Sequence, residues 1–299
     1  MGKRIATTTK DWLGTIPLPV YPPNAKGVLT YAVISHPEIM DITTSVLNSY
    51  SLTIQKELYK APINGQIAQG VYHISGGNDP EIGLMFAWVN SYDKSTKFKC
   101  CIGGVINDSG AYCVSGDMGS YIRKHTGNAK QECFNQINDQ VNNAAGYYLK
   151  LIQDKEQMKI VTVPEKLRAE ILGRLLFQDK LLTLEQASVI RAQIMSPKPE
   201  FTYNANKDSL WVLYAQIVLA LKRGHPKDWL DIQRKTHTWL LKEFGIITVA
   251  QPNVPVQVDL IDSIAEVTFE QLGITTENHP VQFPEPPAEP ESPPISYDL

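Results

Sequence analysis

The residues of this chain that are best suited to chemistry are cations and aromatic rings between positions 90 and 130. From 94 to 130, six Lys or Arg side chains stand against two carboxylates, Asp108 and Asp117. Cations neutralise phosphates while aromatic rings stack on bases, so this composition indicates a groove for a nucleic-acid backbone. The same lysines would also suit a solvated sheet edge that resists aggregation. The predicted contact residues are Tyr92, Lys94, Lys97, Lys99, Tyr121, Arg123, Lys124 and His125.

The segment 90–95, Asn-Ser-Tyr-Asp-Lys-Ser, is the most distinctive polar stretch of this region. Asn90 and Asp93 can close Asx turns on the backbone, and the two serines offer hydroxyl groups. Next to Lys94 and Lys97, such a turn would suit a phosphate. An ordinary hairpin connection needs the same residue types, so both interpretations stay open.

Enzymatic fingerprints are absent from the sequence. It has no phosphate loop, dinucleotide fingerprint, nucleophile elbow or zinc-protease motif. Cys113 and His125 would be a nucleophile and its base only with a third, orienting group, which no motif supplies. An enzyme that acts through Asp93 and His125 is therefore the weakest alternative, and we expect no catalytic residues and no cofactor.

A metal site is not expected either. The nearest candidate ligands are spaced unlike the paired ligands of structural zinc. Adjacent cysteines on a strand point to opposite faces, so only one of Cys100 and Cys101 could join a site. The candidate set is Cys100, Cys101, Cys113, His125 and Cys133.

The elements that must position these residues follow from hydrophobic periodicity. Between 51 and 122, short segments rich in β-branched and aromatic residues alternate with turn residues such as Asn64-Gly65, which is typical of an antiparallel meander. A helix is expected before it, and apolar residues at helical spacing fill the chain from 129 to 244. The predicted fold class is α+β, an antiparallel β-meander with a preceding helix and a helical C-terminal half. The helices are expected at 38–50, 129–159, 164–177, 183–194, 208–222 and 227–244.

Four regions are expected along the chain. A proline-containing extended arm covers 1–27, an α+β core with the sheet covers 28–160, and a helical region covers 161–248. The last region, 249–299, is an acidic proline-rich tail, expected to be disordered from about 280 because it has little apolar surface to bury. The helix pair at 164–177 and 183–194 resembles a helix-turn-helix in spacing, although plain core packing produces such pairs more often.

Charge is segregated along the chain. Through Lys242 there are 28 basic and 21 acidic residues, whereas from Glu243 onward there are 10 acidic residues and no Lys or Arg. Such a pattern indicates polyanion binding or regulation by the tail, unless the tail merely increases solubility. No long apolar run occurs and no apolar segment follows the first basic residues, so we expect a cytoplasmic protein that makes no membrane contact, with free thiols.

Several of these motifs together resemble the DUF932 family, phage- and plasmid-borne proteins of unassigned function. The similarity covers about 28–245, but Cys113-Val114-Ser115-Gly116 replaces the Cys-Ser-Asn-Gly turn of the family. The matching elements are segment 90–95, Gly103-Gly104, Cys113, Ser115-Gly116, segment 123–126, and the helical segments 209–214 and 220–222. The resemblance implies a mobile-element protein that acts in a bacterial cytoplasm.

The architecture and the basic sheet are also loosely similar to Rad52-like single-strand annealing proteins, which would imply a ring or filament of identical chains. Together these observations favour a non-catalytic protein that binds or anneals single-stranded DNA in replication or recombination. The acidic tail would compete with DNA, or dock on a replication partner through its Ile-Ser-Tyr-Asp-Leu end. The alternative is an interaction factor that blocks a host protein, as in counter-defence or host takeover.

Overall fold

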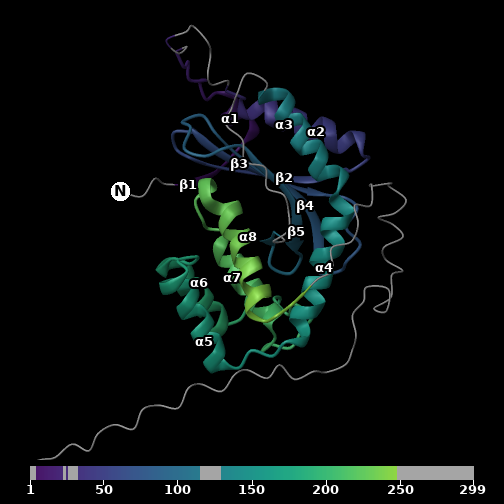
Figure 1. Cartoon of the computed structure of the whole chain (residues 1–299), viewed down its shortest axis with the longest axis vertical. Helices are drawn as coiled ribbons and strands as arrows, with labels where there is room; N and C mark the ends of the chain where they lie inside the picture. The colour runs from purple at the N-terminus through teal and green to yellow at the C-terminus, as the bar shows by residue number, and fades with distance from the viewer. Residues whose placement is uncertain (1–4, 23–24, 26–32, 115–128, 248–299) are drawn as a thin grey trace, which may run out of the picture. The chain divides into compact units, whose positions relative to one another are not determined.

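In the part of the chain that the structure describes, six strands form one sheet and eight α-helices pack around it (Figure 1). This computed structural model describes residues 5–22, 25, 33–114 and 129–247. The strands are β1 (Ile5–Thr8), β2 (Ile54–Pro62), β3 (Ile67–Ile74), β4 (Ile82–Ser91), β5 (Lys99–Ile106) and β6 (Ala111–Cys113). The helices are α1 (Lys10–Gly14), α2 (His36–Ser49), α3 (Ala129–Asn142), α4 (Ala144–Ile160), α5 (Glu165–Gly173), α6 (Leu184–Met195), α7 (Leu210–Leu221) and α8 (Pro226–Glu243), and a π-helical turn, Arg174–Gln178, follows α5. The predicted α+β class is confirmed.

The sheet is an antiparallel meander whose spatial order, β1 to β6, is the order of the chain. Tyr72 of β3 lies opposite Phe86 of β4, which lies opposite Ile102 of β5. Gly65, in the turn between β2 and β3, has a φ of +63°, a conformation that favours glycine. The turn residues therefore divide the strands as the sequence predicted.

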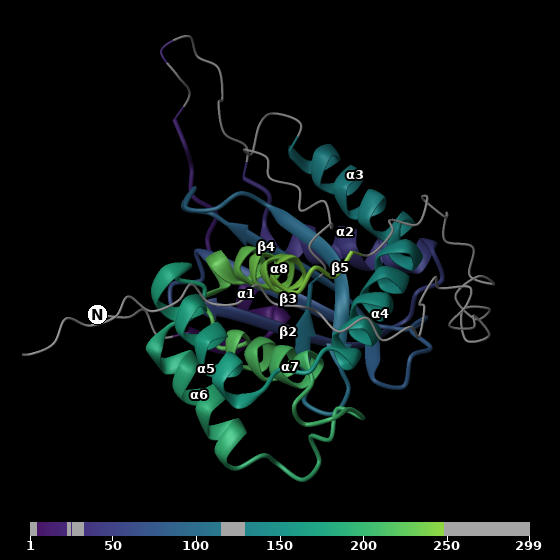
Figure 2. The ribbon, with the colours of Figure 1, turned by 60° about the horizontal axis from the view of Figure 1, so that its bottom comes forward.

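Helices cover both faces of the sheet. Successive side chains of a strand point to opposite sides, and along β4 Phe86 and Trp88 join the core that α2, α3, α4 and α7 share. Met85 and Val89 of the same strand join a second core that includes Trp229 of α8. Figure 2 shows α8 lying across β3 and β4. β4 is therefore buried on both sides, as its nearly unbroken apolar sequence requires.

The N-terminal segment contains two elements that the expected extended arm did not include. Residues Ile5–Thr8 form β1, which pairs with β2 so that Thr7 lies opposite Lys60. α1 follows directly, and the Thr9 side chain caps it by accepting a hydrogen bond from the Trp12 N–H. The acidic tail at 249–299 lies outside the described residues.

Capping boxes mark the first turns of two helices. Ser35 and Glu38 form a capping box at the start of α2, and Thr183 and Gln186 form one at the start of α6. The single helix expected over 129–159 is divided at Asn143 into α3 and α4. No described helix is both long and apolar enough to cross a membrane.

A buried polar network joins the helical half to the end of the sheet. His237 of α8 lies with Nε2 2.8 Å from Asp154 Oδ2 of α4 and with Nδ1 2.9 Å from the Tyr214 hydroxyl of α7. All three side chains are fully buried. Because a buried charge is stable only when it is paired, this network fixes how α4, α7 and α8 lie against one another.

We predict that His237→Phe lowers the free energy of unfolding by about 3–5 kcal/mol, because it leaves the Asp154 carboxylate buried without its partner. Urea denaturation measures this loss. The double variant with Asp154→Leu should recover part of it, since removing both partners leaves no orphaned charge. A loss below about 1 kcal/mol in the single variant would contradict the role of this network.

Candidate functional site

The segment 90–95 connects β4 to β5 and also anchors the chain that enters α2. The Asn90 amide donates hydrogen bonds to the Ile34 carbonyl (3.0 Å) and contacts His36 Nδ1 (3.2 Å). Asp93 Oδ1 accepts a hydrogen bond from the Ser95 N–H (3.0 Å), which closes an Asx turn. These contacts give Asn90 and Asp93 structural roles in the connection, as the hairpin interpretation expects.

Tyr92 does not fit the stacking role that the sequence assigned to it. Its side chain is fully buried, and its ring stacks on His36 with the two centroids 4.0 Å apart. Its hydroxyl accepts a hydrogen bond from the His36 N–H (2.7 Å). In this arrangement the ring packs the hairpin onto α2 and is not available to a nucleic-acid base.

Lys99 also requires a correction, because it is buried and paired. Its ammonium group lies 2.5 Å from Asp231 Oδ2 of α8, and the residue is only 6% exposed. Alternation along a strand predicted a basic face, but α8 covers that face and supplies the carboxylate. Lys99 therefore attaches α8 to the sheet and does not offer a cation to solvent.

The other predicted residues are divided between exposed positions and undescribed ones. Lys94 is exposed in the left-handed region at φ +60°, with its ammonium group 3.7 Å from the Tyr21 ring centroid. Lys97 is exposed in the same turn. The positions that lie outside the described residues are Tyr121, Arg123, Lys124 and His125.

A group of cations that sequence analysis missed lies where β2 and β3 meet the connection from α7 to α8. We call Lys56, Lys60, His73 and Lys222 the sheet–loop cluster. Lys56 lies directly opposite His73 in the sheet, and the Lys60 ammonium donates a hydrogen bond to the Lys222 carbonyl (2.6 Å). The Lys222 ammonium donates to the Gly110 carbonyl (2.8 Å), in a turn where glycine has a φ of +62°. Four basic side chains therefore meet at one place on the surface.

Burial, with repulsion between neighbouring cations, lowers the pKa values of Lys60, His73 and Lys222. Burial, followed by the charge of Lys222, lowers the pKa of Lys60, and burial with the charge of Lys56 lowers the pKa of Lys222. Burial and the charges of Lys56 and Lys222 lower the pKa of His73. No described carboxylate forms an ion pair with any of the three lysines. Within the described part of the chain, the cluster is thus a concentration of positive charge without a carboxylate partner.

The ion pairs of α4 show how this chain neutralises a cation that is buried inside the fold. Lys155 is almost fully buried and lies 2.6 Å from Asp79 and 2.9 Å from Glu156. Burial opposes the charge of Lys155, but the bonds to these carboxylates raise its pKa. Lys60 and Lys222 have carbonyl partners instead, so no described carboxylate neutralises their charge.

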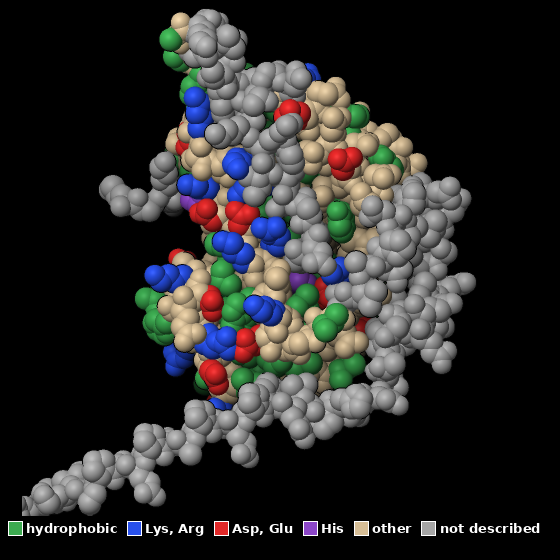
Figure 3. Space-filling view, in the orientation of Figure 1, with side chains coloured by type: hydrophobic (Ala, Val, Ile, Leu, Met, Phe, Trp, Pro, Cys, Tyr) green, Lys and Arg blue, Asp and Glu red, His purple; other side chains and the backbone are tan. Residues whose placement is uncertain are grey.

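More basic residues extend the cluster along the connection between α7 and α8. Arg223 is exposed there, and Lys227 is partly exposed at the start of α8, whose N-terminal dipole also favours anions. Figure 3 shows Lys and Arg side chains interspersed with Asp and Glu side chains on the face that carries α8. The signals in the sequence were Lys56 and Lys60, each two residues from Leu58, and the run Lys-Arg-Gly-His-Pro-Lys at 222–227.

The cysteines offer no reactive thiol. All four are free and buried. Burial raises the pKa of Cys113 well above its usual range, and its hydrogen bond with Tyr214 offsets only part of this effect. Because the thiolate is the nucleophile, Cys113 is suited to packing. Within the described residues, no group of His, Cys, Asp or Glu side chains could hold a metal ion.

No family model, no curated protein and no solved structure matches this chain. The resemblance to the DUF932 family therefore stays a prediction.

We predict that His73 reduces stability in acid. Its pKa is lowered in the folded protein, so the unfolded chain binds the proton more readily, and stability should fall as the pH drops below the unfolded pKa of about 6.5. Chemical denaturation between about pH 7.5 and 5.5 should show a smaller loss for His73→Gln than for the original chain. Equal losses would contradict the crowding of positive charge around His73.

Proposed function

We propose that this chain is a non-catalytic nucleic-acid-binding protein whose sheet–loop cluster holds the phosphate backbone of single-stranded DNA. The observation that carries this proposal is the convergence of Lys56, Lys60 and Lys222 without a described carboxylate partner. Cations held together against their own repulsion are stabilised when an anion binds between them. A polyanion with regularly spaced phosphates would also reach Arg223 and Lys227 beside the cluster.

The surface of the helical pair α5 and α6 favours single-stranded DNA as the ligand over a duplex that is recognised through its major groove. A recognition helix needs cations and hydrogen-bonding side chains on its exposed face. Arg191 is the one exposed cation of α6, and it shares that surface with exposed Leu184, Glu185 and Met195. This composition does not suit insertion of α6 into the major groove of a duplex.

In this proposal the acidic tail regulates DNA binding. Lys94 and Lys97 contact the DNA strand outside the sheet–loop cluster. The tail has the sign of charge that would compete with DNA for the cluster. A place in phage or plasmid replication or recombination, with assembly of several chains, belongs to the same proposal and follows from the resemblance. The alternative, an interaction factor against a host protein, has no comparable observation in its favour.

We predict that Lys56→Gln and Arg223→Gln each weaken the binding of single-stranded DNA about fivefold at low salt, because each removes one phosphate contact. Fluorescence anisotropy of a labelled strand of about 40 nucleotides, titrated at several salt concentrations, measures this loss. Each substitution should also reduce the slope of affinity against salt by about 0.7, the value for one contact with a single strand. Both residues are exposed, so neither change threatens the fold.

Lys166→Gln, an equally exposed charge change on α5, is the matched control and should bind like the original chain. Duplex of equal length should bind more weakly. The proposal fails if the original chain does not bind single strands at low salt, or if Lys56→Gln and Arg223→Gln bind as well as the control.

A further inference from the structure

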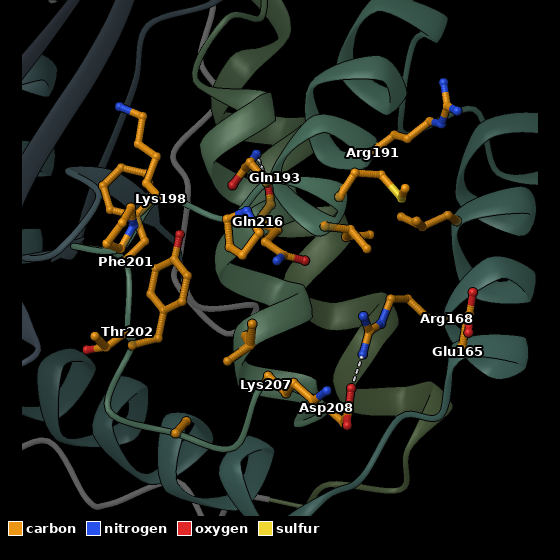
Figure 4. A pocket seen from close by; sticks show the side chains of 18 of the residues that line it. Glu165, Arg168, Arg191, Gln193, Lys198, Phe201, Thr202, Lys207, Asp208 and Gln216 are labelled. Atoms are coloured by element: carbon orange, nitrogen blue, oxygen red, sulfur yellow. Dashed lines mark hydrogen bonds and ion pairs between the residues drawn. The ribbon is translucent and has the colours of Figure 1, made fainter.

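A cavity of about 900 Å³ lies between α5, α6, α7 and the connection that joins α6 to α7 (Figure 4). Its size suits a drug-sized or nucleotide-sized ligand. It lies apart from the residues of the sheet–loop cluster, none of which lines it. Its lining has three chemically different parts: an apolar and aromatic wall, a pair of amide groups and a cationic rim.

The first kind is an apolar and aromatic wall. Phe201 and Tyr203 come from the connection, with their ring centroids 6.0 Å apart, and Leu172, Ile194 and Met195 come from α5 and α6. Met195 is 71% exposed even though it is apolar. A flat, weakly polar group would bury this surface and stack on a ring.

The second kind is a pair of amide groups in the cavity. Gln216 of α7 is only 7% exposed, and its Oε1 has no hydrogen-bond partner among the described residues. Gln193 of α6 donates a hydrogen bond to the Gln216 carbonyl (3.3 Å), while its own Oε1 also lacks a described partner. Figure 4 shows the Gln216 amide pointing into the cavity. A buried polar group without a partner is costly, so both amides would favour a ligand with polar edges.

The third kind is a cationic rim. Arg191 and Lys207 line the cavity without a described ion-pair partner. Arg168 is already held by Asp208 at 2.9 Å, and Glu165 contributes the remaining carboxylate. Lys198 lies a loose 3.8 Å from Glu200. The charge that remains available at the rim is therefore positive.

We infer that this cavity binds one nucleotide, with its base against the aromatic wall and the glutamine amides and its phosphate at the cationic rim. A purely apolar ligand would leave both amides unsatisfied, and a bare phosphate would leave the wall uncovered. This inference rests on the proposed function and deepens it, because it gives the bound strand a place for an unpaired base.

The position of the cavity on α7 agrees with that use. Gln216 and Lys222 lie on α7 and at its C-terminal cap, so that about 9 Å of helix rise separates them. A strand that contacts the cluster therefore passes close to the helix that lines the cavity. Stacking of a base on an aromatic side chain depends little on which base is bound.

The test is calorimetric titration of the full chain with dAMP, dGMP, dCMP and TMP, beside deoxyribose 5-phosphate and inorganic phosphate. At least one nucleotide should bind once per chain, at least about tenfold more tightly than either phosphate without a base. Gln216→Leu and Arg191→Gln should each weaken nucleotide binding at least about fivefold. Lys235→Gln, an exposed charge change on α8, is the control and should bind normally.

Gln216→Leu should remain folded, since leucine replaces an amide that has no described partner for its oxygen. No nucleotide binding at millimolar concentration, equal binding of inorganic phosphate, or unchanged binding by both variants would overturn the inference. The two proposals fail separately. If the full chain binds nucleotides but not single-stranded DNA, the proposed function is refuted. If it binds single-stranded DNA but no nucleotide, only the inference about the cavity is refuted.

Discussion

The structure depends on a small polar network that is buried where three helices meet. Asp154, His237 and Tyr214 tie α4, α7 and α8 together, and the carboxylate and imidazole can stay buried only as partners. This constraint places α8 across the second face of the sheet. It also holds the connection between α7 and α8 beside β2 and β3, so that Lys222 approaches lysines that are distant in the sequence.

The same packing determines which cations are neutralised inside the fold and which can bind an external anion. α8 carries Asp231 to Lys99, and the loop after β3 carries Asp79 to Lys155, so both of these cations are neutralised inside the fold. No described carboxylate reaches Lys60 or Lys222. Repulsion within the sheet–loop cluster costs stability, and a bound phosphate backbone would remove that cost.

Local patterns were sufficient to predict the architecture but not the site. The meander depends on turn residues and strand patterns within a few positions of one another, so sequence reasoning found it. Lys99 looked like a surface cation because its partner lies on a helix more than a hundred residues away. Lys56 and Lys222 looked unrelated for the same reason, since only the packing of the helical half against the sheet brings their elements together.

Hydrogen exchange of the full chain, followed by mass spectrometry with and without a single strand of about 40 nucleotides, tests the central claim most directly. The account predicts that bound DNA slows exchange in β2 and in the connection between α7 and α8, around Lys56 and Lys222. It predicts little change around Lys99, which α8 already covers. Protection confined to the turn at Lys94 and Lys97, with β2 and that connection unaffected, would contradict it.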